Sequence, residues 1–165
     1  SQSFPSYQFI VAKAPGLEES FYDNLLRSYS NVSYVNNRTY DLLAQAKAAL
    51  VTSGTATLET ALFEVPEVVC YKGSWLSYQI GRRLVKVKYI SLVNLIMDTL
   101  VVKELIQNDL TAENLKAELE DLLTNENRKK ELQQQYVSLI NKLSEGGNAS
   151  AKAAASISQF LSSAT

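Results

Sequence analysis

The apolar positions in the first two thirds of the chain form short continuous runs. Runs of this kind, bounded by turn-forming residues, are typical of strands that are buried on both faces of a parallel sheet. Strands are predicted over residues 7–12, 32–35, 48–52 and 67–71, and a fifth strand over residues 88–92.

Between these runs, apolar residues recur at helical spacing. Helices are predicted over residues 17–28, 40–47 and 55–64. In the first of them Phe21, Leu25 and Leu26 share one face, which is predicted to pack on the sheet. Strands that alternate with helices in this way are joined by right-handed crossovers. The pattern therefore predicts the α/β class, with a Rossmann-like parallel sheet that is flanked by helices.

The last third of the chain has a different pattern, because its apolar residues keep helical spacing throughout. Three helices with charged outer faces are predicted after Thr111, with a break at Gly146 and Gly147. We therefore expect a Rossmann-like domain over residues 1–110 and a C-terminal helical tail over residues 111–165 that packs on it.

The residue types that the chain lacks exclude several kinds of catalytic and metal-binding site. The 165 residues include no histidine and a single cysteine, Cys70. The chain therefore holds no Ser-His-Asp triad, no histidine or cysteine zinc site and no internal disulfide, and no metal is expected. Cys70 lies in an apolar run and is predicted to be an inert core residue. A net charge of −1 argues against nucleic acid as a partner, and no apolar run reaches the ~18 residues of a membrane-spanning helix.

The turn after the third predicted strand is the most informative polar stretch. Here an apolar strand enters a small-residue turn that opens a helix, a place where ligands bind in parallel sheets. Gly54 allows the backbone to approach a ligand closely, and the helix N-terminus offers free N–H groups to an anion. Hydroxyl groups come from Ser53, Thr55 and Thr57. An ordinary helix cap with a turn glycine explains the same residues without a ligand.

Two further polar residues are candidates for ligand contact. Glu59 is not part of a capping box, because position 56 is alanine. Its carboxylate is placed to accept hydrogen bonds from vicinal hydroxyls, as acidic groups do for ribose; a solvated helix glutamate is the alternative. Asn94 follows the predicted strand 88–92 and offers both a donor and an acceptor; a turn asparagine is the alternative.

A basic segment lies between these candidates. Residues 68–97 contain no acidic residue and five basic ones, whereas the flanking segments each sum to −3. Basic residues interleaved with aromatic ones suit an anionic membrane surface or a phosphorylated ligand, and a solvated helix face is the alternative. The candidates for membrane or phosphate contact are Lys72, Trp75, Arg82, Arg83, Lys86 and Lys88.

Taken in series, several of these segments closely resemble lipid-A-disaccharide synthases, which form glycosyltransferase family 19. The resemblance rests on residues 53–59, 66–71, 83–86, 89–95 and 103–107, in the same order and at the same spacing. It implies the GT-B architecture of two Rossmann-like domains, of which this chain corresponds to the C-terminal half.

The resemblance also implies a reaction and a place in the cell. The family enzyme is an inverting glycosyltransferase that moves 2,3-diacylglucosamine from UDP-2,3-diacylglucosamine to 2,3-diacylglucosamine 1-phosphate (lipid X). It works in the cytoplasm as a peripheral protein of the inner membrane. The proposed catalytic base belongs to the N-terminal half. For this chain we therefore expect no catalytic residue, no cofactor beyond the UDP-sugar donor, and nucleotide binding without turnover.

The family's site residues carry over position by position. The resemblance places Ser53, Gly54, Thr55 and Thr57 near the diphosphate. It places Glu59 at the ribose, and it aligns Asn94 with the asparagine of the family's Ser-Leu-Pro-Asn loop, in which Val93 here replaces proline. Proline fixes the backbone φ angle, so the valine makes this loop less rigid.

Two other functions fit the same pattern. One is a UDP-GlcNAc 2-epimerase-like domain, although such proteins usually use histidine or further acidic residues in the cleft and this chain has no histidine. The other is a non-catalytic interaction module whose helical tail packs or forms a homodimer.

Overall fold

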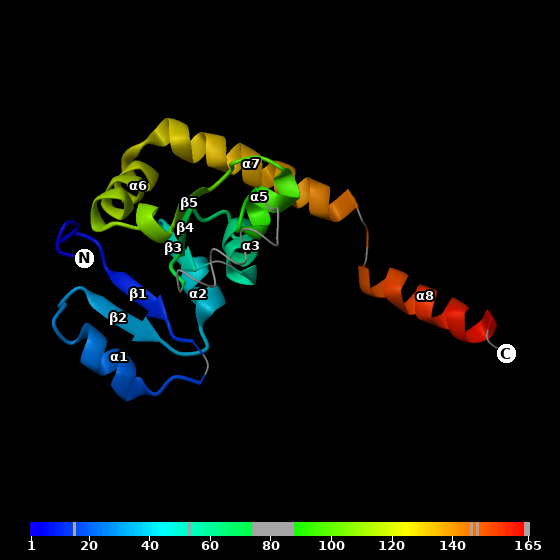
Figure 1. The fold of residues 1–165 in the computed structure, drawn as a ribbon, viewed down its shortest axis with the longest axis horizontal. Helices are drawn as coiled ribbons and strands as arrows, with labels where there is room; N and C mark the ends of the chain where they lie inside the picture. Colours follow the sequence, from blue (N-terminus) through cyan, green and yellow to red (C-terminus); the bar gives the residue numbers. More distant parts are fainter. Residues whose placement is uncertain (15, 53, 74–87, 146, 148, 164–165) are drawn as a thin grey trace.

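Five parallel strands run through the part of the chain that the computed structural model describes, which is residues 1–14, 16–52, 54–73, 88–145, 147 and 149–163. They are β1 (Phe9–Ala12), β2 (Val32–Val35), β3 (Ala49–Thr52), β4 (Glu67–Tyr71) and β5 (Lys103–Ile106). β1 pairs with β2, and the other three form a second sheet in the order β3-β4-β5. The first four predicted strands are confirmed, and so is the α/β class with parallel sheets flanked by helices (Figure 1).

The fifth predicted strand is wrong. Residues 88–91 lead instead into helix α5 (Leu92–Met97), and Ser91 caps it by accepting a hydrogen bond from the backbone N–H of Asn94 at 3.2 Å. The strand lies further along, where Lys103–Ile106 pairs with β4. A serine three residues before a free N–H favours a helix start over an extended strand.

The helices of the first half also differ from prediction in one respect. They are α1 (Glu19–Leu26), α2 (Thr39–Leu43) and α3 (Thr55–Leu62). In α1 the buried residue is Tyr22, whose hydroxyl accepts a hydrogen bond from the N–H of Ala14 at 2.9 Å. Phe21 and Leu25 are 51% and 59% exposed. The predicted inner face of α1 is therefore wrong, because the helix turns toward the side on which Tyr22 satisfies a backbone group.

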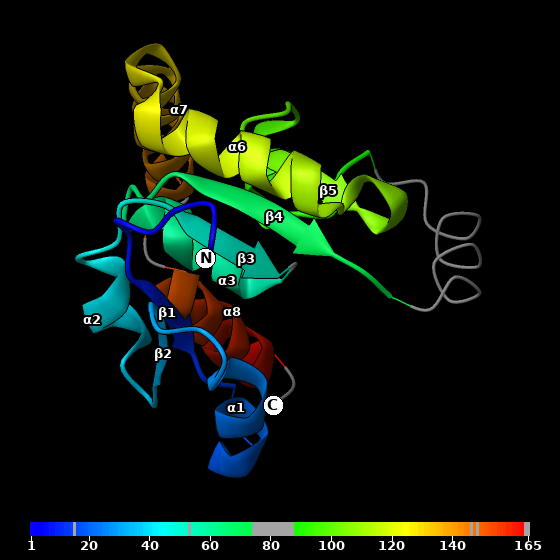
Figure 2. The ribbon, with the colours of Figure 1, turned by 90° about the vertical axis from the view of Figure 1, so that its left-hand side faces the viewer.

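The main core lies between the three-stranded sheet and the helices that follow it. After the short 3₁₀ helix η1 (Gln107–Asp109) come α6 (Ala112–Thr124) and α7 (Glu126–Glu145). Helix α6 packs on β4 and β5, and α7 packs on α3 and α5 (Figure 2). Each large apolar side chain buried here contributes ~1.5–3 kcal/mol. The core includes Val68, Val69, Val102, Leu105, Leu122, Leu132, Tyr136 and Leu139.

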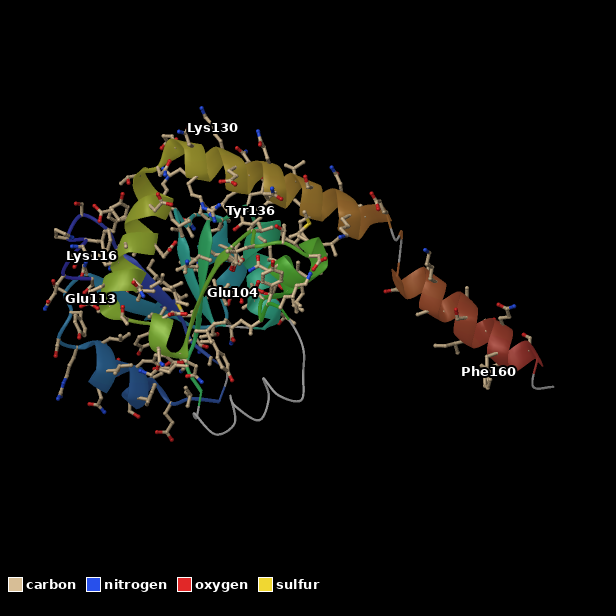
Figure 3. All side chains as sticks on the ribbon, turned by 45° about the horizontal axis from the view of Figure 1, so that its top comes forward. Glu104, Glu113, Lys116, Lys130, Tyr136 and Phe160 are labelled. Atoms are coloured by element: carbon tan, nitrogen blue, oxygen red, sulfur yellow. The ribbon has the colours of Figure 1, made fainter. Side chains whose placement is uncertain are left out.

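The last helix, α8 (Ala149–Ser163), extends away from the rest of the molecule (Figure 1). The side chain of Phe160 projects from its far half and is 70% exposed (Figure 3). With α6 and α7, it completes the three helices predicted after Thr111. Among the described residues, no helix combines the length and the apolar character needed to span a bilayer.

Candidate functional site

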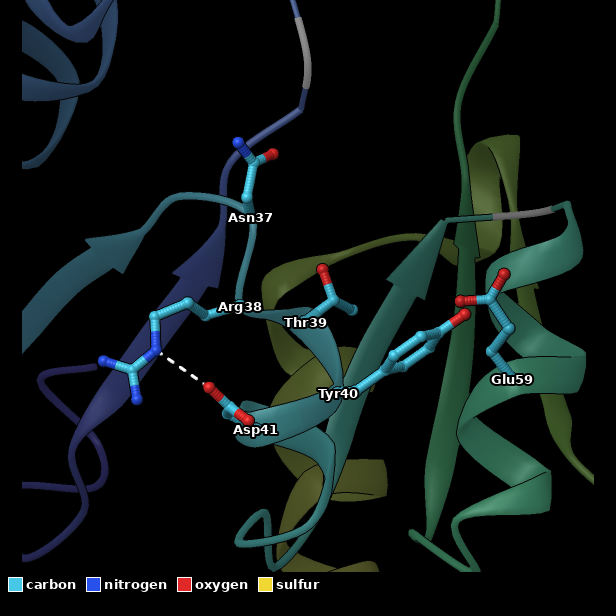
Figure 4. Close-up of a pocket in the computed structure, with 6 residues that line it drawn as sticks. All are labelled: Asn37, Arg38, Thr39, Tyr40, Asp41 and Glu59. Carbon is cyan, nitrogen blue, oxygen red and sulfur yellow. Dashed lines mark hydrogen bonds and ion pairs between the residues drawn. The ribbon is translucent and has the colours of Figure 1, made fainter.

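A pocket of about 410 Å³ opens beside the carboxyl ends of the strands (Figure 4). One wall is the segment that leaves β2 and forms α2, and the other is α3. The pocket is lined by Asn37, Arg38, Thr39, Tyr40, Asp41 and Glu59. Ligands in open parallel sheets bind at this edge, so the position of the pocket matches the place where chemistry is expected.

The wall that follows β2 is polar and partly fixed by its own contacts. Asn37 has a φ angle of 53°, in the left-handed region, which turns the chain sharply after the strand. The guanidinium of Arg38 donates to the carboxylate of Asp41 at 2.9 Å. The ring of Tyr40 stacks on Phe63 with a centroid distance of 5.5 Å and an interplanar angle of 14°. This wall therefore offers a held aromatic ring, a cation and several hydrogen-bonding groups.

The opposite wall supplies one carboxylate. Glu59 lies on α3 and is half-buried, and its side chain points across the opening toward the hydroxyl end of Tyr40 (Figure 4). The structure thus places Glu59 in the lining of a pocket. It does so with partners from residues 37–41 that the sequence did not suggest.

The turn before α3 has a backbone that favours glycine. Gly54 has φ 137° and ψ −161°, a region that other residues adopt only with strain. A Cβ added to Gly54 would meet nothing within 4 Å, so the space beside it is open. Among the described residues no side chain caps α3, so the N–H groups of Thr55 and Ala56 can meet an anion, whereas that of Thr57 donates to the carbonyl of Gly54 at 3.3 Å.

The threonines of this turn divide between two tasks. Thr55 is exposed at the first position of α3. Thr57 is fully buried, and its hydroxyl donates to the carbonyl of Gly54 at 2.8 Å. This hydrogen bond holds the backbone of the turn at Gly54 in place. Ser53 lies outside the described residues.

Asn94 does not face the pocket. Its side chain is fully buried, and its oxygen accepts hydrogen bonds from the N–H groups of Val101 and Val102, both at 2.9 Å. Its amide donates to the carbonyl of Val102 at 2.8 Å and to the carboxylate of Glu104 at 2.9 Å. Because every polar atom of the side chain is engaged, the structure gives Asn94 a structural task, and a direct ligand contact would break these bonds.

Glu104 extends this network. Its carboxylate also accepts hydrogen bonds from the N–H groups of Ile90 and Ser91, the shortest at 3.0 and 2.9 Å. Glu104 and Asn94 together tie the chain before α5 to strand β5. The sequence prediction did not single out Glu104, because no strand was predicted over residues 103–106.

The basic segment is only partly described. Lys72 is exposed just after β4. Lys88 forms an ion pair with Asp98 at 2.9 Å, and this hydrogen-bonded partner raises the pKa of the lysine and lowers that of the aspartate. The other four candidates, Trp75, Arg82, Arg83 and Lys86, lie outside the described residues.

The described residues offer no metal site. They contain no cluster of three or more histidine, cysteine, aspartate or glutamate side chains that is arranged to hold a metal ion. Cys70 is partly buried against the core, and burial raises the pKa of its thiol above the ordinary value. A raised pKa leaves the thiol protonated and unreactive near neutral pH.

The wall formed by residues 37–41 is the main feature that the sequence prediction missed. Its signal was present, since polar residues follow the predicted strand 32–35 directly. The rule that singled out the turn after the third strand applies equally to the turn after the second.

Comparison with known proteins gives a consistent result. The family model described as lipid-A-disaccharide synthetase matches residues 1–158. A lipid-A-disaccharide synthase from Anaeromyxobacter sp. (strain K) is 42% identical over 121 residues, which are 72% of this chain and 32% of the relative. The synthase from Syntrophus aciditrophicus is 40% identical over 144 residues, 86% of this chain and 38% of the relative. The synthase from Hahella chejuensis is 37% identical over 164 residues, 97% of this chain and 40% of the relative. The chain thus spans well under half the length of the relatives that it matches.

Proposed function

Because the chain belongs to the lipid-A-disaccharide synthetase family, we propose that its pocket is the donor-nucleotide site of such a glycosyltransferase. The proposed donor is UDP-2,3-diacylglucosamine, and the proposed acceptor is 2,3-diacylglucosamine 1-phosphate, which other parts of the enzyme bind. The observation that carries the proposal is the position of Glu59. Its carboxylate enters a pocket at the strand ends, on a helix whose N-terminus begins beside the open space at Gly54.

The proposed binding mode follows from the chemistry of each part. The carboxylate of Glu59 accepts hydrogen bonds from the ribose hydroxyls. The N–H groups at the start of α3, beside the turn at Gly54 that the Thr57 hydroxyl holds by a hydrogen bond, receive the diphosphate. The negative charge that grows on UDP as it departs is stabilised by the same N–H groups. An inverting transfer also needs a base at the acceptor hydroxyl, and we assign none to this chain, so it binds the nucleotide without turnover.

Replacing Glu59 with glutamine is expected to weaken UDP binding by roughly 10- to 100-fold. The reason is that a hydrogen bond to a charged acceptor is worth ~1.5–3 kcal/mol. Isothermal titration calorimetry with UDP measures the change. The same titration with 2′,3′-dideoxy-UDP separates the ribose contact from other effects, because Glu59→Gln should then make little further difference.

The control for this experiment is Glu120→Gln, which removes an exposed carboxylate on α6 and should leave the affinity unchanged. If Glu59→Gln binds UDP as well as the native chain does, the carboxylate is a solvated helix residue and the assignment fails. If the folded native chain binds no UDP at millimolar concentration, the whole proposal fails.

We also propose that the enzyme works at the cytoplasmic face of the inner membrane, with the basic residues of the segment 68–97 toward the lipid. Vesicles that contain anionic phosphatidylglycerol should retain the chain at low salt and release it at high salt, because salt screens exposed charges. A sedimentation assay measures retention, and vesicles of neutral phosphatidylcholine are the control. Equal retention by both kinds of vesicle would contradict the electrostatic contact.

A further inference from the structure

The aromatic rings of Tyr40 and Phe63 form a stacked pair beside the pocket. Tyr40 belongs to the lining of the pocket, and Phe63 directly follows the last residue of α3. The two side chains are 59% and 41% exposed, and neither belongs to the main core. Large apolar surface that stays in water at the edge of a pocket is typical of a surface that contacts a ligand.

The outer face of α3 presents a series of different groups. Thr55, Glu59 and Phe63 are spaced four residues apart, so they follow one another along the same face of the helix. The N–H of Phe63 donates to the carbonyl of Glu59 at 3.2 Å, which continues the helical register to Phe63. Each step of four residues advances about 6 Å along the axis. The face therefore carries, in order, the start of the helix, a carboxylate and an aromatic ring.

The parts of a nucleoside diphosphate follow one another in a matching order. The proposed binding mode puts the diphosphate at the start of α3 and the ribose hydroxyls at the carboxylate of Glu59. The base and the 5′-phosphate leave the ribose ring at opposite ends, so the base continues past Glu59 and away from the start of the helix. The next turn along this face holds Phe63 and the ring of Tyr40 that stacks on it.

Tyr40 is the member of the pair that is placed to meet the base. One face of its ring is covered by Phe63, at a centroid distance of 5.5 Å, and its hydroxyl end lies opposite the carboxylate of Glu59 (Figure 4). The stacking on Phe63 holds the ring in place, so that little freedom is lost when a ligand binds. Nucleic-acid bases stack readily on aromatic side chains of this kind.

We propose that the free face of Tyr40 stacks on the uracil ring of the nucleotide, which makes Tyr40 a specificity-determining residue of the site. This inference rests on the proposed donor-nucleotide function and extends it to the base. Phe63 acts through Tyr40, as a positioning residue.

The test compares two ligands, UDP and ribose 5-diphosphate, which is UDP without its base. Isothermal titration calorimetry measures the affinity of each. Tyr40→Leu is expected to weaken UDP binding by roughly 5- to 100-fold, which is the range for the loss of one base stack. It should leave the affinity for ribose 5-diphosphate unchanged. Tyr40→Phe keeps the ring and should bind both ligands as the native chain does.

The control is Tyr29→Leu, which removes a tyrosine that is 44% exposed and is not among the residues that line the pocket. It should leave both affinities unchanged. NMR supplies a second measurement that needs no variant. The uracil H5 and H6 signals should shift upfield on binding to the native chain, because they then lie over an aromatic ring, and this shift should be lost in Tyr40→Leu.

Several results would overturn the inference and leave the donor-nucleotide proposal standing. They are equal UDP affinity in Tyr40→Leu and the native chain, and an equal loss in Tyr40→Phe and Tyr40→Leu. Unshifted uracil signals in the native complex, or native affinity for UDP no greater than for ribose 5-diphosphate, would do the same. If the folded native chain binds neither ligand, the donor-nucleotide proposal itself fails, and the role of Tyr40 fails with it.

Discussion

Glu67→Gln is expected to stabilise the fold near neutral pH, by an amount that grows as the pH rises. Glu67 opens strand β4, is 1% exposed, and neither carboxyl oxygen has a hydrogen-bond partner among the described residues. Burial raises the pKa of this carboxyl to about 9. The group is therefore neutral in the folded chain at pH 7, and glutamine has nearly the same size and charge.

The sign follows from the two pKa values. The carboxyl keeps its proton in the folded chain up to about pH 9, but loses it in the unfolded chain near pH 4.5. The unfolded state binds fewer protons between these values, so the native chain loses ~1.4 kcal/mol of stability for each pH unit in that window. The gain from Glu67→Gln should be small at pH 4.5 and on the order of 3 kcal/mol at pH 7.

Urea unfolding at several pH values measures this difference. The matched control is Glu120→Gln, which removes an exposed carboxylate and should reproduce the native profile. Parallel stability curves for Glu67→Gln and the native chain between pH 5 and pH 8 would show that Glu67 is ionised in the folded protein.

Asn94→Ala is expected to destabilise the fold by ~4 kcal/mol or more. The asparagine side chain bonds the buried backbone of Val101 and Val102 and the carboxylate of Glu104, and alanine leaves these groups without partners. A buried donor or acceptor that loses its partner costs ~1–3 kcal/mol, and changes above ~4 kcal/mol come from such networks. Thermal and urea unfolding measure the loss.

Asn114→Ala is the control, because the exposed side chain of this asparagine donates one hydrogen bond, to the carbonyl of Asp109 at 2.9 Å. It should cost no more than ~1 kcal/mol. The experiment also separates the two roles considered for Asn94. A variant that keeps its stability but loses UDP affinity would restore the direct ligand contact implied by the family resemblance.

The strands and the polar residues at their ends show how much of the structure can be predicted from short segments of the sequence. Residues 67–71 were predicted as a strand because a short continuous apolar run is typical of a strand that is buried on both faces. Residues 88–92 were misread for the same reason, since an apolar run does not reveal that Ser91 starts a helix. At the site, Gly54 and Glu59 were found because the strand-turn-helix pattern is local.

The strand-end pattern also marks the polar partners of Glu59 after β2, but it does not reveal that they lie opposite this glutamate. They come from residues 37–41, and only the packing of α2 beside α3 brings them to the same pocket (Figure 4). Likewise, the sequence marked Asn94 as a candidate for ligand contact. The direction of its side chain, however, depends on the chain that leads into β5, which begins nine positions later at Lys103.

The sequence alone determined the first four strands with the helices between them, the absence of histidine chemistry and the turn that starts α3, because each depends on neighbouring residues. The tertiary structure decided which polar side chains line the pocket and which make hydrogen bonds inside the fold. It also decided which strands pair, in the orders β1-β2 and β3-β4-β5. Both are matters of spatial neighbourhood, which is set by the pairing of segments far apart in the chain and is not encoded in any single segment.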